Sequence, residues 1–315
     1  MPYPIFDTHV DLLHHLIKHR IEKPFSALDE GILTPKTLSR GGVRIFGSAF
    51  YCPDKHNGSD TALAYLQSLL VYAEKQTASL PLVRTREDLR RIWQMPGAET
   101  GTIFLLENCD SLVEWGVDAC RQAGFSILGL THISGNRLGD GNGVESPRGL
   151  SSHGRRIVRE AEEIGLIIDV AHLSRPTFQD AVEVTDSALI STHTGFARFN
   201  PIPRNLTDDQ IRLLIDRGGM IGVAVAPEIL APNGKITIED LEVQIDWFVQ
   251  RFGPAHLGLG TDFGGFRGSI TGLENPSQLQ ELASLLENRG YGEQNVAGIM
   301  WENWYSFFSR SLPSE

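Results

Sequence analysis

Short apolar runs alternate with longer amphipathic stretches along most of the chain. Eight runs each end in a polar residue or a turn, and they cover residues 5–7, 43–50, 102–107, 126–132, 166–172, 188–193, 220–225 and 256–262. Runs of this length and composition are typical of parallel strands that are buried on both faces. The pattern therefore predicts a parallel sheet.

Apolar residues recur at helical spacing between several of these runs. The predicted helices cover residues 60–75, 148–165, 174–184 and 206–219. Ser174 and Thr207 stand at helix starts, where a hydroxyl can cap free backbone N–H groups, and Gly165 and Gly218 stand at helix ends. Alternating strands and helices fit a closed barrel or an open doubly wound sheet, and eight repeats favour the barrel.

The segment from about Asn275 to Phe308 is expected to form two or three further helices. It is rich in aromatic residues, which we expect to pack under or beside the barrel; they are Trp301, Trp304, Phe307 and Phe308. No Pro/Gly/Ser-rich linker and no repeat divides the chain. The predicted fold class is therefore α/β, a (β/α)₈ TIM barrel with extra C-terminal helices, in which residues 1–315 form a single domain.

Charge and cysteine content restrict the partners and the compartment. A formal net charge of -11 argues against binding to nucleic acid or to an anionic membrane surface, because both need a basic face. Cys52, Cys109 and Cys120 are odd in number and widely spaced, which suits free thiols in a reducing compartment. The sequence shows neither a secretory pattern at its start nor an apolar run of about 18 residues. We expect a cytoplasmic protein without nucleic-acid or membrane partners.

Candidate metal ligands occur at the ends of five predicted strands, where barrel enzymes carry their active sites. These residues are His9, Asp11, Glu107, His172, His193 and Asp262. Each alone is more often structural, but three histidines and three carboxylates on one barrel face are hard to explain without a metal. A set of histidines and carboxylates without cysteine suits zinc, with manganese and iron as competitors. Six residues are enough for two metals that share a bridging carboxylate.

Two further residues are candidates for substrate binding. His132 ends the fourth apolar run and could polarise a carbonyl or hydrogen-bond a substrate. Arg204 follows the sixth run, where a guanidinium could hold a carboxylate with two hydrogen bonds, or could pair at the surface with Asp208 or Asp209. The other histidines carry no predicted site role, and they are His14, His15, His19, His56, His153 and His256.

Seven short motifs carry a family resemblance across nearly the whole chain. They are D-T-H-V-D (7–11), L-L-E-N-C-D-S-L (105–112), L-T-H (130–132), D-V-A-H-L-S (169–174), S-T-H-T (191–194), P-R-N-L-T-D-D (203–209) and G-L-G-T-D-F-G-G (258–265). Each is weak alone, but together and in this order they are specific. The chain resembles the membrane (renal) dipeptidase family of zinc peptidases, within the amidohydrolase-like metal-dependent hydrolases.

The resemblance implies a ligand set for two Zn²⁺ ions per chain. His9 and Asp11 would bind one zinc, His172 and His193 the other, and Glu107 would bridge them. Enzymes of this family cleave dipeptides with a free amino end and often tolerate a D-residue at the carboxyl end. The expected function is therefore that of a zinc-dependent dipeptidase, a metallopeptidase whose partner is a small dipeptide and which we expect to be a homodimer.

The resemblance also implies roles in catalysis and substrate binding. His132 and Arg204 would hold the substrate, and Asp262 would contact it and carry a proton near the first metal. In this scheme hydroxide between the two metals attacks the scissile carbonyl, and His132 stabilises the oxyanion. Gly264 departs from the family, which often has a second aspartate there. Cys109 also departs from it, and we expect this cysteine to lie close to the metals and to be open to oxidation.

Two alternatives remain open. Another hydrolase on the same barrel, such as a lactonase, a phosphotriesterase or a deaminase, would use similar ligands. A binding protein could carry the metals without turnover. The presence of all the expected ligands together with Asp262 counts against the second alternative.

Overall fold

Eight parallel strands form a closed barrel in the computed structural model, which describes residues 2–94 and 99–314. The strands are β1 Ile5–Val10, β2 Val43–Tyr51, β3 Gly101–Glu107, β4 Phe125–Gly129, β5 Ile167–Asp169, β6 Ile190–Thr194, β7 Met220–Val223 and β8 Leu257–Leu259. Each strand pairs with the next along the chain, and β8 pairs with β1. The barrel is confirmed, and the open doubly wound sheet is excluded.

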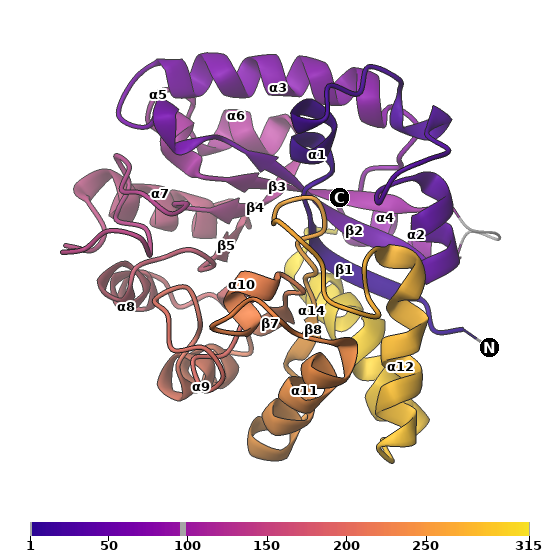
Figure 1. The fold of residues 1–315 in the computed structure, drawn as a ribbon. Coiled ribbons are helices and arrows are strands. Elements are labelled where there is room, and N and C mark those ends of the chain that lie inside the picture. The colour runs from indigo at the N-terminus through magenta and orange to yellow at the C-terminus, as the bar shows by residue number, and fades with distance from the viewer. Residues whose placement is uncertain (1, 95–98, 315) are drawn as a thin grey trace.

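The helices pack around the strands, most of them as an outer ring (Figure 1). They are α1 Leu12–Lys18, α2 Pro35–Gly41, α3 Thr61–Thr77, α4 Arg86–Gln94, α5 Leu112–Trp115, α6 Val117–Gln122, α7 Ser152–Glu163, α8 Arg175–Val184, α9 Asp208–Asp216, α10 Pro227–Leu230, α11 Ile238–Phe252, α12 Leu279–Asn288, α13 Glu293–Ala297 and α14 Asn303–Ser311. Within the described residues, we find no helix with the length and apolar character needed to span a lipid bilayer.

Two of the predicted helix starts are capped as expected. Ser174 accepts a hydrogen bond from the backbone N–H of Thr177, and Thr207 accepts one from that of Gln210. These bonds satisfy backbone donors that have no partner inside the helix. Helix α7 begins at Ser152 rather than at residue 148, because the preceding residues belong to the long loop that follows β4.

Strands β4, β5 and β8 end three residues earlier than their apolar runs predict. The last three residues of each run lie outside the sheet, and the three runs end in His132, His172 and Asp262. His172 and Asp262 adopt φ angles of 64° and 65°, in the left-handed region that side chains with a Cβ rarely occupy. Such strain persists only where the surroundings enforce it, and it is concentrated at functional sites.

The C-terminal helices close the amino-terminal end of the barrel. The Phe308 ring of α14 stacks on Phe6 of β1 with centroids 5.2 Å apart, and Trp304 Nε1 donates to the Leu259 carbonyl at 3.0 Å. Trp301 stacks on Trp93 at 4.7 Å. This confirms that the aromatic tail packs under the barrel.

Candidate metal centre

A pocket of about 370 Å³ lies at the carboxyl ends of the barrel strands. Seven of the eight predicted site residues line it, namely Asp11, Glu107, His132, His172, His193, Arg204 and Asp262. The eighth, His9, lies directly beneath, within reach of Asp11 and Glu107. The structure therefore brings all the predicted residues together, although they come from six different strands or the loops that follow them.

Glu107 stands at the centre of this group, because its two carboxylate oxygens face different histidines. Oε2 lies 3.9 Å from Nε2 of His9. Oε1 lies 3.2 Å from Nε2 of His172 and 3.7 Å from Nε2 of His193. A carboxylate placed in this way can bind two metal ions at once, one through each oxygen.

The potential ligand atoms form two overlapping triplets around Glu107. Glu107 with His9 and Asp11, and Glu107 with His172 and His193, each offer three atoms within 4.8 Å of one another. Nε2 of His9 and Oδ1 of Asp11 are buried and have no hydrogen-bond partner among residues 2–94 and 99–314. Imidazole nitrogens and carboxylate oxygens are ligands that zinc prefers, so this donor set fits two metal ions.

The charges of the pocket favour a cation beside His9. Burial lowers the pKa of His9, but the carboxylates of Asp11, Glu107 and Asp262 outweigh it and raise this pKa to about 10. Burial holds the pKa of His172 and of His193 well below its usual value, with help from nearby Arg204. His172 and His193 are therefore held neutral, as metal ligands must be, and the carboxylates around His9 favour a positive charge that a metal ion could supply in place of the His9 proton.

Asp262 approaches Asp11 only because residue 265 is a glycine. A Cβ at Gly265 would lie 2.2 Å from Oδ2 of Asp11 and 2.2 Å from Oδ1 of Asp262. The Asp262 backbone N–H donates to the His9 carbonyl at 2.8 Å, which fixes the loop after β8 against β1. Asp262 also forms a third triplet with His9 and His193, so its position allows either ligation or proton transfer.

Arg204 is buried, with 8% of its surface exposed, and it lines the pocket. Its Nη2 donates to the His193 carbonyl at 2.6 Å, which ties the guanidinium to a candidate ligand. The alternative of a surface ion pair is excluded, because Asp208 pairs with Arg251 and Asp209 pairs with Arg212.

His132 is oriented by residues that the sequence did not single out. Its Nδ1 lies 3.2 Å from Oδ2 of Asp54 and 3.5 Å from the hydroxyl of Tyr51. The Ser134 backbone N–H donates to the same Asp54 oxygen at 3.2 Å. Since Nδ1 faces Asp54, Nε2 on the other side of the ring is the atom left for a substrate.

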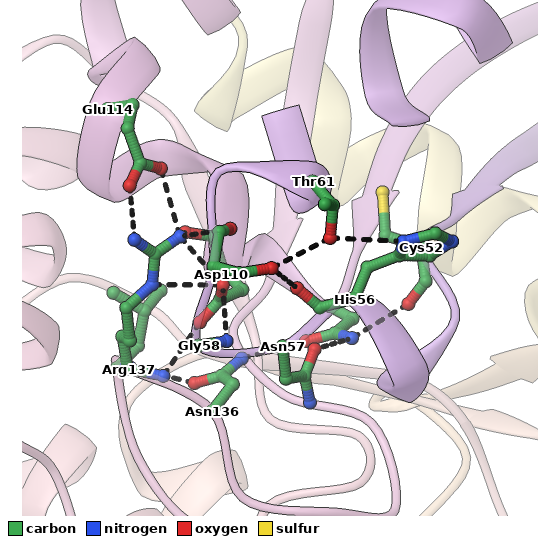
Figure 2. A network of polar contacts seen from close by, with 12 residues as sticks. Cys52, His56, Asn57, Gly58, Thr61, Asp110, Glu114, Asn136 and Arg137 are labelled. Carbon is green, nitrogen blue, oxygen red and sulfur yellow. Dashed lines mark hydrogen bonds and ion pairs between the residues drawn. The ribbon is translucent and has the colours of Figure 1, made fainter. Parts of the chain in front are cut away.

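A polar network ties together the loops after β2, β3 and β4, which carry Asp54, Asp110 and His132. Figure 2 shows the Arg137 guanidinium directed at Asp110 and Glu114. Arg137 Nη2 donates to Asp110 at 2.7 Å, and the Gly58 backbone N–H donates to the same carboxylate at 3.0 Å. These contacts stiffen the pocket wall around His132.

The structure corrects two expectations. His14, for which no site role was predicted, lines the pocket from α1, and its ring lies 5.4 Å from that of Tyr51. Its spacing of three residues from Asp11 at the start of a helix was the available signal. Cys109 was expected near the metals, which stays a prediction, and open to oxidation, which is wrong, because its thiol is fully buried in the core and donates to the Leu106 carbonyl. Burial raises the Cys109 pKa well above its usual value, which disfavours the reactive thiolate.

Comparisons with known proteins identify relatives of this chain. Dipeptidase tcpJ of Claviceps purpurea is 32% identical over 217 residues, which cover 64% of this chain and 51% of the relative. An uncharacterized protein in the pqqA 5' region of Klebsiella pneumoniae is 29% identical over 204 residues, which cover 60% of this chain and 73% of that protein. The matched region spans about half the length of two fungal dipeptidases, 51% of tcpJ and 44% of aclJ from Aspergillus oryzae.

Solved structures show the same fold. The dipeptidase AC, a metallo peptidase of family M19, matches with a TM-score of 0.90 at 24% identity and covers 99% of both chains. A Rhodobacter sphaeroides metallo peptidase bound to a phosphinate mimic of L-Ala-D-Ala matches with a TM-score of 0.88 at 22% identity, covering 99% of this chain and 100% of that one. The profile of the membrane dipeptidases matches residues 2–310, and the chain therefore belongs to the membrane dipeptidase family, peptidase family M19.

Proposed function

We propose that this protein is a zinc-dependent dipeptidase that hydrolyses the peptide bond of dipeptides, including dipeptides with a D-residue at the carboxyl end. The observation that carries the proposal is the position of Glu107 in a pocket with a buried arginine. One Glu107 oxygen faces His9, and the other faces His172 and His193. Membership of the membrane dipeptidase family supports the same reaction. The barrel and its C-terminal helices would act as one domain.

The proposed ligands follow from the two triplets around Glu107. His9 and Asp11 would hold one Zn²⁺, His172 and His193 the other, and Glu107 would bridge both. When bound, two zinc ions supply Lewis acidity that activates water and polarises a carbonyl group.

The remaining pocket residues would bind the substrate and move protons. Arg204 would pair with the carboxylate of the last residue, since its guanidinium is buried and fixed by the His193 carbonyl. His132 would donate from Nε2 to the oxygen of the scissile carbonyl. Asp262 would take a proton from the attacking water and return it to the leaving amine.

The size and lining of the pocket suit a small peptide. Its volume of about 370 Å³ lies at the lower end of the range for small-molecule sites. Ile133, Ile229 and Phe266 give it apolar walls that can cover substrate side chains. A buried arginine at one end favours substrates with a free carboxylate close to the scissile bond, so long peptides should be poor substrates.

A substrate panel tests this proposal. Zinc-loaded protein is assayed with dipeptides, among them L-Ala-D-Ala, and with a lactone, a phosphotriester and an aminopurine. We expect turnover of dipeptides alone. Faster turnover of any of the other compounds would replace the dipeptidase by another hydrolase, and no turnover of any compound would favour a metal-bearing binding protein.

The metal content gives a separate prediction. Because Glu107 faces both histidine groups, protein purified without chelator should contain two zinc equivalents per chain by elemental analysis. Removal of zinc by a chelator should abolish hydrolysis, and added zinc should restore it. A value of one equivalent in fully active protein would contradict a bridging role for Glu107.

A further inference from the structure

One buried hydroxyl contacts ligands of both proposed metals. Thr192 precedes His193 in β6 and is fully buried. Its Oγ1 lies 3.2 Å from Nδ1 of His9 and 3.0 Å from Nδ1 of His193. The same oxygen lies 2.5 Å from Oδ2 of Asp169. Two histidines from different strands and one carboxylate therefore share a single threonine.

Counting donors and acceptors fixes the direction of these hydrogen bonds. A threonine hydroxyl has one hydrogen to donate and two lone pairs that accept, whereas a carboxylate only accepts. Asp169 therefore takes the hydroxyl hydrogen, and both contacts from the histidines must be donated by Nδ1–H. Nε2 of each ring then keeps its lone pair, and this is the atom that faces Glu107.

Asp169 is fixed in a position where it accepts the hydrogen of the Thr192 hydroxyl. It is buried, with 1% of its surface exposed, and it accepts the backbone N–H of Thr192 at 2.9 Å and that of Ala171 at 3.0 Å. Thr8 of β1 also holds the Thr192 backbone in place, because its hydroxyl donates to the Thr192 carbonyl at 2.9 Å. The backbone and the side chain of Thr192 are thus both held by hydrogen bonds within the barrel.

We propose that Asp169 and Thr192 are positioning residues that hold His9 and His193 in the Nδ1–H tautomer, so that one hydroxyl orients a ligand of each zinc ion. The inference deepens the proposed zinc centre and rests on it. Free histidine prefers the proton on Nε2, which would block metal binding at that atom. Partners of this kind typically change metal affinity by about 10–100-fold when they are removed.

Thr192→Val and Thr192→Ser form the matched pair for a test. Valine keeps the shape of threonine but lacks the hydroxyl, whereas serine keeps the hydroxyl. Zinc binding is measured by competition with a chromophoric chelator. We expect Thr192→Val to weaken both zinc sites by about 10–100-fold and Thr192→Ser to stay close to wild type. Thr102→Val is the control for replacing a buried threonine by valine, because Thr102 is buried in β3 and its hydroxyl donates to the Phe46 carbonyl, away from the proposed ligands.

Three outcomes of the binding measurement would overturn the proposal. The first is a folded Thr192→Val protein with wild-type affinity at both sites. The second is a loss confined to one site, which would mean that the hydroxyl does not serve both ligands. The third is an equal loss in Thr192→Ser, which would assign the effect to packing of the methyl group.

A spectroscopic measurement on the wild-type protein tests which ring nitrogen carries the proton, and it does not require Thr192→Val to fold. In ¹⁵N spectra of metal-free wild-type protein, the neutral rings of His9 and His193 should carry their proton on Nδ1, because no zinc is present to impose that tautomer. A neutral ring with its proton on Nε2 would overturn the inference. Neither measurement uses peptide turnover. A wild type that binds two zinc ions but cleaves no dipeptide would therefore contradict the proposed function and leave this inference standing.

Discussion

Asp262→Asn should retain both zinc ions and lose about 10²–10⁴-fold in kcat for dipeptide hydrolysis, the usual contribution of a positioned proton carrier. Asparagine keeps the shape of the side chain but cannot accept and release a proton. The hydrogen bond from the backbone N–H of residue 262 to the His9 carbonyl does not depend on the side chain, and asparagine tolerates the φ of 65° as aspartate does. The measurement combines steady-state kinetics with elemental analysis of the same preparation.

The metal content separates two roles that the geometry allows. Asp262 also lies within a triplet with His9 and His193, so a true ligand would occupy the same position. Loss of zinc from Asp262→Asn would assign ligation to Asp262 and contradict its role as a proton carrier. Asp216→Asn is the matched control, because Asp216 is exposed at the end of α9, and this variant should show wild-type rates.

The fold could be predicted because both of its periodicities are local. Strands that are buried on both faces appear in the sequence as unbroken apolar runs, and surface helices appear as amphipathic stretches. Eight repeats of this pair therefore indicate a barrel before any contact is known. The sequence predicts the ends of the strands less precisely than their existence. The residues after Gly129, Asp169 and Leu259 stay buried but leave the sheet, because His132, His172 and Asp262 lie on loops that bend toward the pocket.

The candidate ligands could be predicted for a related reason. Every parallel barrel gathers the carboxyl ends of its strands on one face, so polar residues at those ends meet without any knowledge of register. Residues that orient a ligand or a substrate-binding side chain are harder to predict, because their contacts depend on strand register and on the paths of the loops. Asp169 reaches Thr192 because β5 pairs with β6 at Ile190, and Asp54 reaches His132 across two loops. No local pattern in the sequence encodes such contacts.

Arg204→Met should lower kcat/KM for dipeptides by about 30-fold to several thousand-fold. Truncating one partner of a buried charged pair costs about 2–5 kcal/mol, and each 1.4 kcal/mol is about tenfold. Arg204→Lys should lose less, because lysine keeps a charge but not the planar fork that matches a carboxylate. The rates are compared by steady-state kinetics, with zinc content measured because Arg204 also bonds the His193 carbonyl.

A dipeptide amide distinguishes recognition of the carboxylate from general damage to the site. The amide lacks the group that Arg204 would pair with, so wild type should process it poorly and Arg204→Met should lower its turnover little further. Arg198→Met provides the matched control, since Arg198 lies six residues upstream, is exposed and is absent from the pocket lining. If Arg204→Met lowers acid and amide turnover by the same factor at unchanged zinc content, Arg204 does not read the carboxylate, and specificity for dipeptides must arise elsewhere in the pocket.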